Sequence, residues 1–319
     1  MTDSHALDST APALIDNDTD NNVLDYLSVD DYDYELPDSL IARYPLAQRS
    51  ASKLLYLATD NQKNTASVQD RLFAELPDLL NAGDLIVFND TKVMKARLFG
   101  QKDTGGKIEV LIERLVNLSD LDVTTLHVET IDDTAVNKEH IALCHVKASK
   151  APKLGQRVSL ADGHMNAVMI GRQDNLFILA FEAPILPHLE LYGELPIPPY
   201  FERHADDTDN TRYQTVFHDP AKLASVAAPT ASLHFDESVL NQLTEKGINT
   251  AFVTLHVGAG TFAPVKTDNL LNHTMHSEYA HLPQATADLI NQTLQTATKS
   301  LPLVQLSLAS LKLRIKRLQ

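Results

Sequence analysis

One short segment combines small side chains with a histidine. Residues 225–235 read SVAAPTASLHF, so His234 follows a run of small residues and lies two positions after Ser232. Small side chains let a backbone approach a ligand closely, and histidine exchanges protons near neutral pH. A satisfied histidine in a tightly packed core is the alternative interpretation. On spacing alone, the packed core is the commoner of the two.

A second segment places glycines after an apolar strand. Residues 248–257 (INTAFVTLHV) are typical of a buried strand, and Gly258 and Gly260 follow in the loop GAGTF. Ligands bind at strand ends in α/β folds, and glycine permits close backbone approach. The loop lacks the third glycine and the following helix of a dinucleotide fingerprint, which excludes a Rossmann site. An ordinary strand turn remains the alternative.

The segment HTMHSEY (273–279) brings His276, Ser277 and Glu278 together. It lacks the helical His-x-x-x-His spacing and the third ligand of a zinc site, so we expect no metal here. A polar surface segment is the alternative. The segment RYQTVFHDP (212–220) is equally open to a structural or a functional interpretation.

Composition indicates a globular protein with an acidic N-terminal tail. The 319 residues are 44% apolar, and no run is long enough to span a bilayer. The N-terminus has no basic and apolar stretches typical of a signal peptide, and the single Cys144 permits no internal disulfide, so the cytoplasm is the expected compartment. Residues 1–38 hold eleven Asp and Glu and no Lys or Arg, although the net charge of the whole chain is −15. The folded remainder is therefore near neutral.

The order of elements predicts an α/β protein with an inserted all-β domain. Residues 37–45 predict a short helix, 70–81 an amphipathic helix and Leu85–Phe88 a buried strand. Short alternating strands then follow, beginning with a hairpin that turns at Gly105-Gly106 and including LHVETI, IALCHVKA, RVSLA, NAVMIG and NLFILAF. After the proline-rich connection 185–200, helix and strand alternate: a helix at 236–247 capped by Gly247, the strand 248–257 and a helix at 284–298.

These patterns predict five segments. They are a disordered acidic tail (1–28), the first part of the α/β core (29–94), the inserted β-barrel domain (95–186), the second part of the core (187–299) and an atypical C-terminal segment (300–319).

Basic residues gather in the β segment. Such a set usually indicates a solvent-exposed barrel face. The functional interpretation is a surface that binds phosphates. Few aromatic residues are interleaved, so structured RNA fits better than a single strand. The candidate RNA-binding residues are Lys95, Arg97, Lys107, Lys147, Lys150 and Lys153.

Several segments together resemble the S-adenosylmethionine:tRNA ribosyltransferase-isomerase family of queuosine biosynthesis. They lie in the family's order over roughly residues 29–295 and include YELPDSLIARYPLAQRSASKLL, GDLIVFNDTKVMKARLFGQKDTGGKIEVLIER, ASKAPKLG, ELPIPPYFER, RYQTVF, SVAAPTASLHFDESVLNQLTEKGI and AFVTLHVGAGTFAPVKTDNLLNHTMHSEY. The resemblance implies an α/β-barrel core with an inserted β-barrel, action as a monomer and no metal. It also implies transfer of the ribosyl part of S-adenosylmethionine to the aminomethyl group of a 7-deazaguanine base in tRNA, with release of adenine and methionine.

The reaction assigns roles to particular residues. The sulfonium acidifies the neighbouring ribose carbon, so a base must lie beside it, and adenine needs a proton to leave. We expect His234 to be the leading general acid/base, with His256 and Glu278 as further catalytic residues. S-adenosylmethionine is expected as a consumed substrate, so no cofactor is predicted. The residues expected to bind it are Asn89, Asp90, Thr91, Tyr213, Thr230, Ser232, Gly258 and Gly260.

Two segments depart from the family pattern. Position 232 is Ser where the family usually has Gly, so a positive φ there would be strained. Residues 300–319 contain no glycine and no acid and match nothing expected, which predicts a frameshift or a truncated reading frame. The alternative function is therefore an inactive homologue that at most binds RNA. An ordinary methyltransferase is disfavoured, because the early glycine-rich strand–loop–helix expected there is missing.

Overall fold

The computed structural model describes residues 28–60, 65–121, 139–262, 264–274 and 278–296, which fall into two compact units. The first unit combines residues 1–36 with 264–275. Its described part holds the 3₁₀ turns Val29–Tyr32 and Leu270–Asn272, joined where the amide of Val29 donates to the carbonyl of Asp268 at 3.1 Å. None of the described helices combines the length and apolar character needed to span a bilayer.

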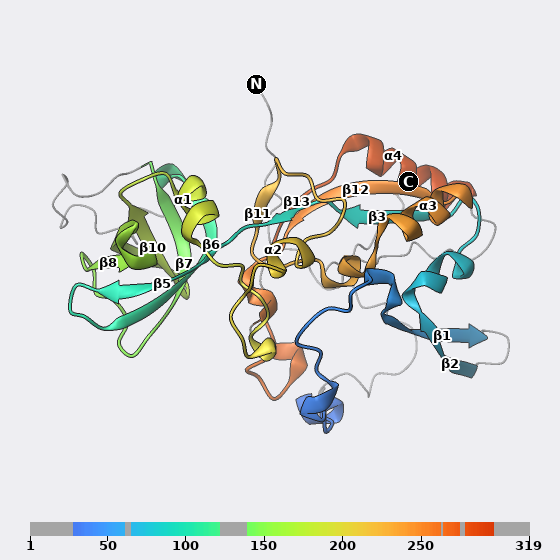
Figure 1. Ribbon diagram of the computed structural model, residues 1–319, viewed down its shortest axis with the longest axis horizontal. Coiled ribbons are helices and arrows are strands. Elements are labelled where there is room, and N and C mark those ends of the chain that lie inside the picture. Colours follow the sequence, from blue (N-terminus) through green and yellow to red (C-terminus); the bar gives the residue numbers. More distant parts are fainter. Residues whose placement is uncertain (1–27, 61–64, 122–138, 263, 275–277, 297–319) are drawn as a thin grey trace. The chain divides into compact units, whose positions relative to one another are not determined.

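The second unit contains a closed six-stranded barrel (Figure 1). Its strands are β5 (Arg97–Lys102), β6 (Lys107–Val116), β7 (Ile141–Ala148), β8 (Arg157–Leu160), β9 (Met165–Gln173) and β10 (Leu176–Phe181). They close in the order β10-β7-β6-β5-β8-β9, with antiparallel neighbours. The predicted all-β segment is thus confirmed as a barrel, while LHVETI lies outside the described residues.

The alternation of side chains on β6 shows how the barrel interior is filled. On β6, Ile108, Val110 and Ile112 are buried, whereas Glu109 and Leu111 between them are half-buried and Lys107 before them is exposed. Successive strand residues face opposite sides, so one apolar stripe per strand fills the interior.

The α/β part of this unit is built around two central strands. β3 (Leu85–Asn89) pairs in parallel with β12 (Asn249–His256), and β13 (Tyr279–His281) lies antiparallel on the other edge of β12. A second parallel pair joins β4 (Lys92–Val93) to β11 (Leu223–Ser225). The mixed α/β class is confirmed, and closure of this part into an α/β barrel stays a prediction.

Helices pack against the central strands. In α4 (Gln284–Thr296), the hydroxyl of Thr286 donates to the carbonyl of Phe252 at 2.8 Å. In α3 (Glu237–Glu245), Asp236 caps the first turn by accepting from the amide of Val239 at 3.1 Å. Gly247, with a φ of 74°, follows the end of α3 as predicted, because the left-handed region favours glycine.

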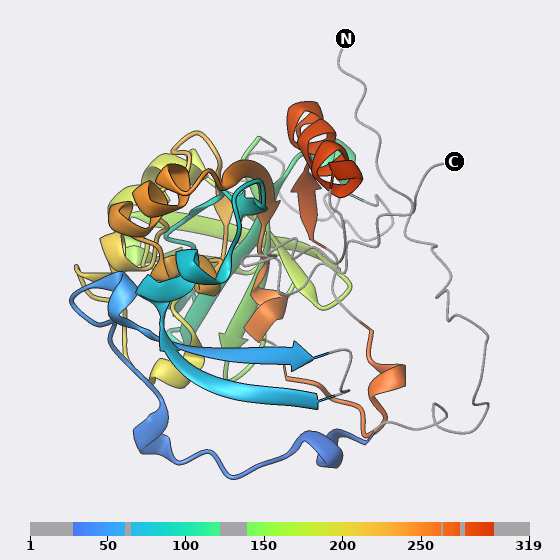
Figure 2. The ribbon, with the colours of Figure 1, turned by 90° about the vertical axis from the view of Figure 1, so that its right-hand side faces the viewer.

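Two predicted helices are wrong. Residues 37–45 form only the 3₁₀ turn Asp38–Leu40. Residues 70–81 divide between β2 (Thr65–Leu72), which pairs with β1 (Lys53–Asp60) in the blue hairpin of Figure 2, and the 3₁₀ helix Phe73–Leu79. Pro77 lies inside that helix, where it lacks the N–H that an α-helix requires.

The proline-rich connection also differs from the prediction. It contains α1 (Ile185–Tyr192), and the short α2 (Asp209–Arg212) follows. The predicted loop GAGTF contains a 3₁₀ turn at Ala259–Phe262. The proposed boundaries between the five segments remain predictions.

Candidate active site

Asn89 locks the carboxyl end of β3 to β12. Its side-chain amide donates to the carbonyl of Leu255 at 2.9 Å, and its oxygen accepts from the amides of Leu255 at 3.0 Å and Thr91 at 3.1 Å. The side chain is fully buried. Because all three contacts go to backbone groups, this predicted ligand-binding residue has a structural function in shaping the strand end.

Asp90 contacts a hydroxyl and an ammonium group. It accepts from the hydroxyl of Thr254 at 2.8 Å and forms an ion pair with the ammonium group of Lys222. Lys222 is also 3.9 Å from Asp219. Lys222 could not be identified from the sequence, because its neighbours are those of an ordinary surface lysine and it lies 132 residues from Asp90 along the chain.

His256 joins the same group through Thr91. Its Nδ1 lies 3.0 Å from the Thr91 hydroxyl, and its ring stacks on Tyr279 with centroids 5.9 Å apart. Burial lowers the pKa of His256; the charge of Asp90 opposes this shift, and the charge of Lys222 adds to it. A neutral imidazole is therefore favoured. Below, Asn89, Asp90, Thr91, Lys222, Thr254 and His256 are called the strand-end cluster.

Two carboxylates meet the loop 258–260. The amide of Gly258 donates to Glu278 at 3.2 Å, and the amide of Ala259 donates to Glu113 of the barrel strand β6 at 2.8 Å. Gly260 lies in the 3₁₀ turn that follows. The structure thus brings the predicted residues Glu278 and Gly258 into contact and adds Glu113, which the sequence analysis missed.

The small residues of the opening segment are explained in part by packing. The amides of Val226 and Ala227 both donate to the carbonyl of Val257, at 2.8 and 3.2 Å. The buried hydroxyl of Ser225 lies 2.8 Å from the carbonyl of Ala227 and accepts from the amide of Val257 at 2.9 Å. Residues 225–227 are therefore bonded directly to the end of β12, and Val226, Ala227 and Ala228 are buried there.

The rest of that segment forms the 3₁₀ turn Thr230–His234, called the 230–234 turn below. Nδ1 of His234 lies 3.0 Å from the carbonyl of Ala231, so Nδ1 carries the proton that this oxygen accepts. The imidazole packs against Phe73 with centroids 5.4 Å apart. Among the described residues, no hydrogen bond or ring contact joins His234 to the strand-end cluster.

Ser232 is buried in this turn without strain. The strain that a positive φ would cause at position 232 does not arise, since the described residues with positive φ that are not glycine are Ala161, Asp162, Asp174 and Glu202. Within the described part of the chain, the Ser232 hydroxyl has no hydrogen-bond partner, and the residue is fully buried. Thr230, at the start of the turn, is exposed.

Arg49 anchors the 230–234 turn. Its guanidinium donates to the carbonyls of Leu233 and Gln214 at 2.8 Å and of Thr211 at 2.9 Å. Gln214 in turn exchanges two hydrogen bonds with the backbone of Val93 on β4. Both residues lie in quoted family segments, but their sequence neighbours do not reveal that they fix distant backbone.

Tyr213, beside Gln214, is also buried. Its pKa is raised chiefly by this burial, and the residue packs in one apolar cluster with Val93, Ala228 and Leu233. The structure therefore places this predicted ligand-binding residue near the 230–234 turn.

The predicted RNA-binding residues occupy two kinds of environment. Lys95 and Arg97 are partly buried and lie beside Glu190 and Glu109, at 3.7 and 3.3 Å. The other four are exposed: Lys107, Lys147, Lys150 and Lys153. Lys147 faces Glu109 across the β6–β7 ladder, so acidic and basic side chains alternate on this side of the barrel.

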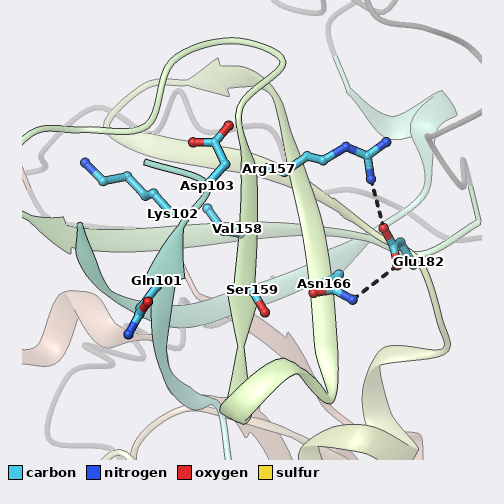
Figure 3. A pocket seen from close by; sticks show the side chains of 8 residues that line it. All are labelled: Gln101, Lys102, Asp103, Arg157, Val158, Ser159, Asn166 and Glu182. Carbon is cyan, nitrogen blue, oxygen red and sulfur yellow. Dashed lines mark hydrogen bonds and ion pairs between the residues drawn. The ribbon is translucent and has the colours of Figure 1, made fainter. Parts of the chain in front are cut away.

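A separate hollow of about 350 Å³ lies on the barrel (Figure 3). Two of its charged groups pair with each other, since Arg157 contacts Glu182 at 3.1 Å, and Glu182 also accepts from Asn166 at 3.4 Å. None of the predicted site residues lines it. In the described part of the chain, no group of three or more His, Cys, Asp or Glu side chains is arranged to hold a metal ion.

Comparison with known proteins agrees with the resemblance found in the sequence. The model of the queuosine biosynthesis protein family matches residues 29–304. The chain belongs to the queuosine biosynthesis protein family. This assignment confirms the resemblance on which the expected reaction was based.

Relatives of known name cover most of the chain. The S-adenosylmethionine:tRNA ribosyltransferase-isomerase of Psychrobacter cryohalolentis is 76% identical over 298 residues, which are 92% of this chain and 74% of the relative. The protein of the same name from Acinetobacter baumannii is 51% identical over 267 residues, covering 84% of this chain and 70% of the relative. The crystal structure of S-adenosylmethionine tRNA ribosyltransferase from Thermotoga maritima is 24% identical, with a TM-score of 0.31, covering 83% of this chain and 65% of that one.

Proposed function

We propose that this protein transfers and isomerises the ribosyl moiety of S-adenosylmethionine onto 7-aminomethyl-7-deazaguanine in tRNA. The products are epoxyqueuosine-tRNA, adenine and methionine. The observation that carries this proposal is the 76% identity, over 92% of the chain, to a relative named for that activity. The strand-end cluster supplies groups suited to it.

His256 is the proposed base. The reaction needs a neutral acceptor beside the ribose carbon that the sulfonium acidifies, and burial favours the neutral imidazole. The Thr91 hydroxyl lies close enough to the carbonyl of Lys222, at 3.4 Å, to donate there and to accept from Nδ1 of His256. In that arrangement Nε2 keeps its lone pair for the proton from carbon.

His234 is the proposed proton donor to the departing adenine. Its Nδ1–H is held by the carbonyl of Ala231, so Nε2 is the nitrogen that exchanges protons with a ligand. The Ser232 hydroxyl beside it, which has no partner among the residues that the structure describes, suits a polar group of the nucleoside. The two histidines need not touch each other, because they serve opposite ends of one substrate.

The remaining expectations follow from the same family. S-adenosylmethionine is consumed, and no resident cofactor is required. The exposed lysines Lys107, Lys147, Lys150 and Lys153 would contact tRNA phosphates. The partly buried Lys95 and Arg97 would contribute to the same RNA-binding surface. We further propose a core of the α/β-barrel type, a monomeric state and a cytoplasmic location.

Product analysis tests the function. The purified protein is incubated with S-adenosylmethionine and tRNA carrying 7-aminomethyl-7-deazaguanine, and adenine and methionine are measured by chromatography. We expect both products in equal amounts, and none with tRNA that carries guanine at that position. Binding of tRNA without adenine release would contradict the proposal in favour of an RNA-binding homologue. Formation of S-adenosylhomocysteine would indicate a methyltransferase.

A further inference from the structure

A barrel residue reaches the loop that follows β12. Glu113 lies in β6 where the register against β7 shifts, since Ile112 faces Cys144 and Arg114 already faces Leu143. A β-bulge leaves one residue outside the ladder and redirects its side chain. The bulge therefore frees Glu113 to point at the loop.

Glu113 contacts two successive residues of this loop. Its Oε2 accepts from the amide of Ala259 at 2.8 Å. A Cβ added to Gly258 would lie 2.2 Å from its Oε1, so the carboxylate occupies the space that any side chain at position 258 would need. His145 of β7, 3.3 Å from the same Oε2, supports the carboxylate from the barrel side.

The loop connects this carboxylate to the proposed base. Gly258 follows His256 by two residues, and its amide donates to Glu278 at 3.2 Å. The backbone of Gly258 and Ala259 is thus held between a carboxylate of the barrel and a carboxylate just before β13. A shift of the loop would move both the ligand-facing glycine and the end of β12.

We propose that Glu113 is a positioning residue for S-adenosylmethionine binding, acting through the backbone of Gly258 and Ala259. It touches no reacting atom, and the inserted barrel thereby contributes to the site built by the α/β strands. This inference rests on the proposed function, because it takes the glycine loop as the surface on which the nucleoside lies.

Steady-state kinetics of adenine release test this role. Glu113→Ala should raise KM for S-adenosylmethionine about tenfold and change kcat less than about threefold, since one lost charge-assisted hydrogen bond corresponds to about a factor of ten. Glu113→Gln keeps an oxygen that accepts from Ala259 and should stay within about threefold of the wild-type KM. Glu182→Ala removes a barrel carboxylate of the hollow in Figure 3 and should leave both constants unchanged.

Two outcomes of these kinetics would overturn the proposal. One is a wild-type KM in Glu113→Ala. The other is an equal rise in KM in Glu113→Gln and Glu113→Ala, which would show that the bond accepted from Ala259 is not what lowers the KM.

Hydrogen exchange separates this proposal from the proposed function. Amide exchange of a peptide covering residues 257–262 should accelerate about tenfold in Glu113→Ala and remain at the wild-type rate in Glu182→Ala. If the wild-type protein released no adenine, the proposed function would fail, while this exchange result would still decide whether Glu113 holds the loop. Unchanged exchange in Glu113→Ala would overturn the positioning role.

Discussion

The two candidate histidines differ in what holds the imidazole. His256 contacts the side chains of Thr91 and Tyr279 and belongs to the strand-end cluster, where burial lowers its pKa. Within the described ranges, His234 bonds to the carbonyl of Ala231 in its own turn and packs on Phe73. The environment of His256 is assembled from distant segments, whereas that of His234 is local. Burial and the charges of Asp90 and Lys222 therefore act on the pKa of His256, whereas the turn fixes the orientation of the His234 ring.

Replacing the histidines has the largest expected effect. His256→Ala and His234→Ala should each reduce kcat for adenine release by at least about a hundredfold, because general acid/base groups contribute about 10²–10⁴-fold. His188→Ala is the matched control for His234, since His188 makes the same kind of local contact, 2.8 Å from the carbonyl of Pro184. Single-turnover adenine release measures the effect. Full activity in His234→Ala would show that His234 serves only to stabilise its turn and does not donate a proton.

Loosening the 230–234 turn should have the next largest effect. Arg49→Lys replaces a guanidinium that binds backbone carbonyls of two segments with an ammonium that lacks its planar fork. We expect a loss of about 2 kcal/mol in the free energy of unfolding, with a lower kcat. Urea denaturation and adenine release give the two values.

A control distinguishes the loss of these backbone contacts from a general effect of an Arg-to-Lys change. Arg157→Lys alters an exposed arginine paired with Glu182 and should change neither value. Wild-type kcat in a destabilised Arg49→Lys variant would show that the position of the turn does not govern catalysis.

The sequence predicted the parts of both regions that depend on local pattern. Alternation in IALCHVKA indicated β7 with its observed bounds, and the glycine at position 247 indicated the end of α3. The polar residues after Leu85–Phe88 were expected at a strand end and are found there. These features follow from side-chain periodicity and backbone sterics, which neighbouring residues determine.

Other parts could not be predicted because they depend on contacts between distant segments. Lys222 and Glu113 each owe their surroundings to partners more than a hundred residues away, at Asp90 and Ala259. The bulge that aims Glu113 leaves no mark in an alternating strand. The small residues 225–228 were compatible with a ligand surface as well as with the commoner packed core, and their bonds to Val257 show that they pack against the end of β12.

Removing the charge of Lys222 should shift the pH dependence that His256 controls. The ammonium lowers the pKa of His256, and Asp90, which Lys222 pairs with, raises it. Lys222→Met therefore raises the pKa of His256 on both counts. The base must be neutral to act. As the pH is lowered, the variant should therefore lose activity at a higher pH than the wild type.

The pH profile of adenine release and an NMR titration of His256 test this shift. Lys246→Met is the control, because Lys246 donates to the carbonyl of Pro77 and has no contact with the strand-end cluster among the described residues. If the acid limb of the Lys222→Met profile lay at the wild-type pH, the charge of Lys222 would not control the protonation of His256.

The smallest expected effect concerns two buried serines. Ser225 lies against Val257, next to His256, and Ser232 lies in the 230–234 turn with His234. Ser232→Ala removes a hydroxyl that lacks a partner in the described part of the protein and should stabilise the free protein by about 1 kcal/mol. Ser225→Ala breaks bonds to Ala227 and Val257 and should destabilise it by a similar amount. If the Ser232 hydroxyl accepts or donates to the nucleoside, the gain in stability will accompany a rise of about threefold in KM for S-adenosylmethionine. Thermal unfolding without ligand, together with initial rates, measures both quantities. A lower melting temperature for Ser232→Ala would reveal a protein partner for that hydroxyl and would remove the reason for assigning it a ligand.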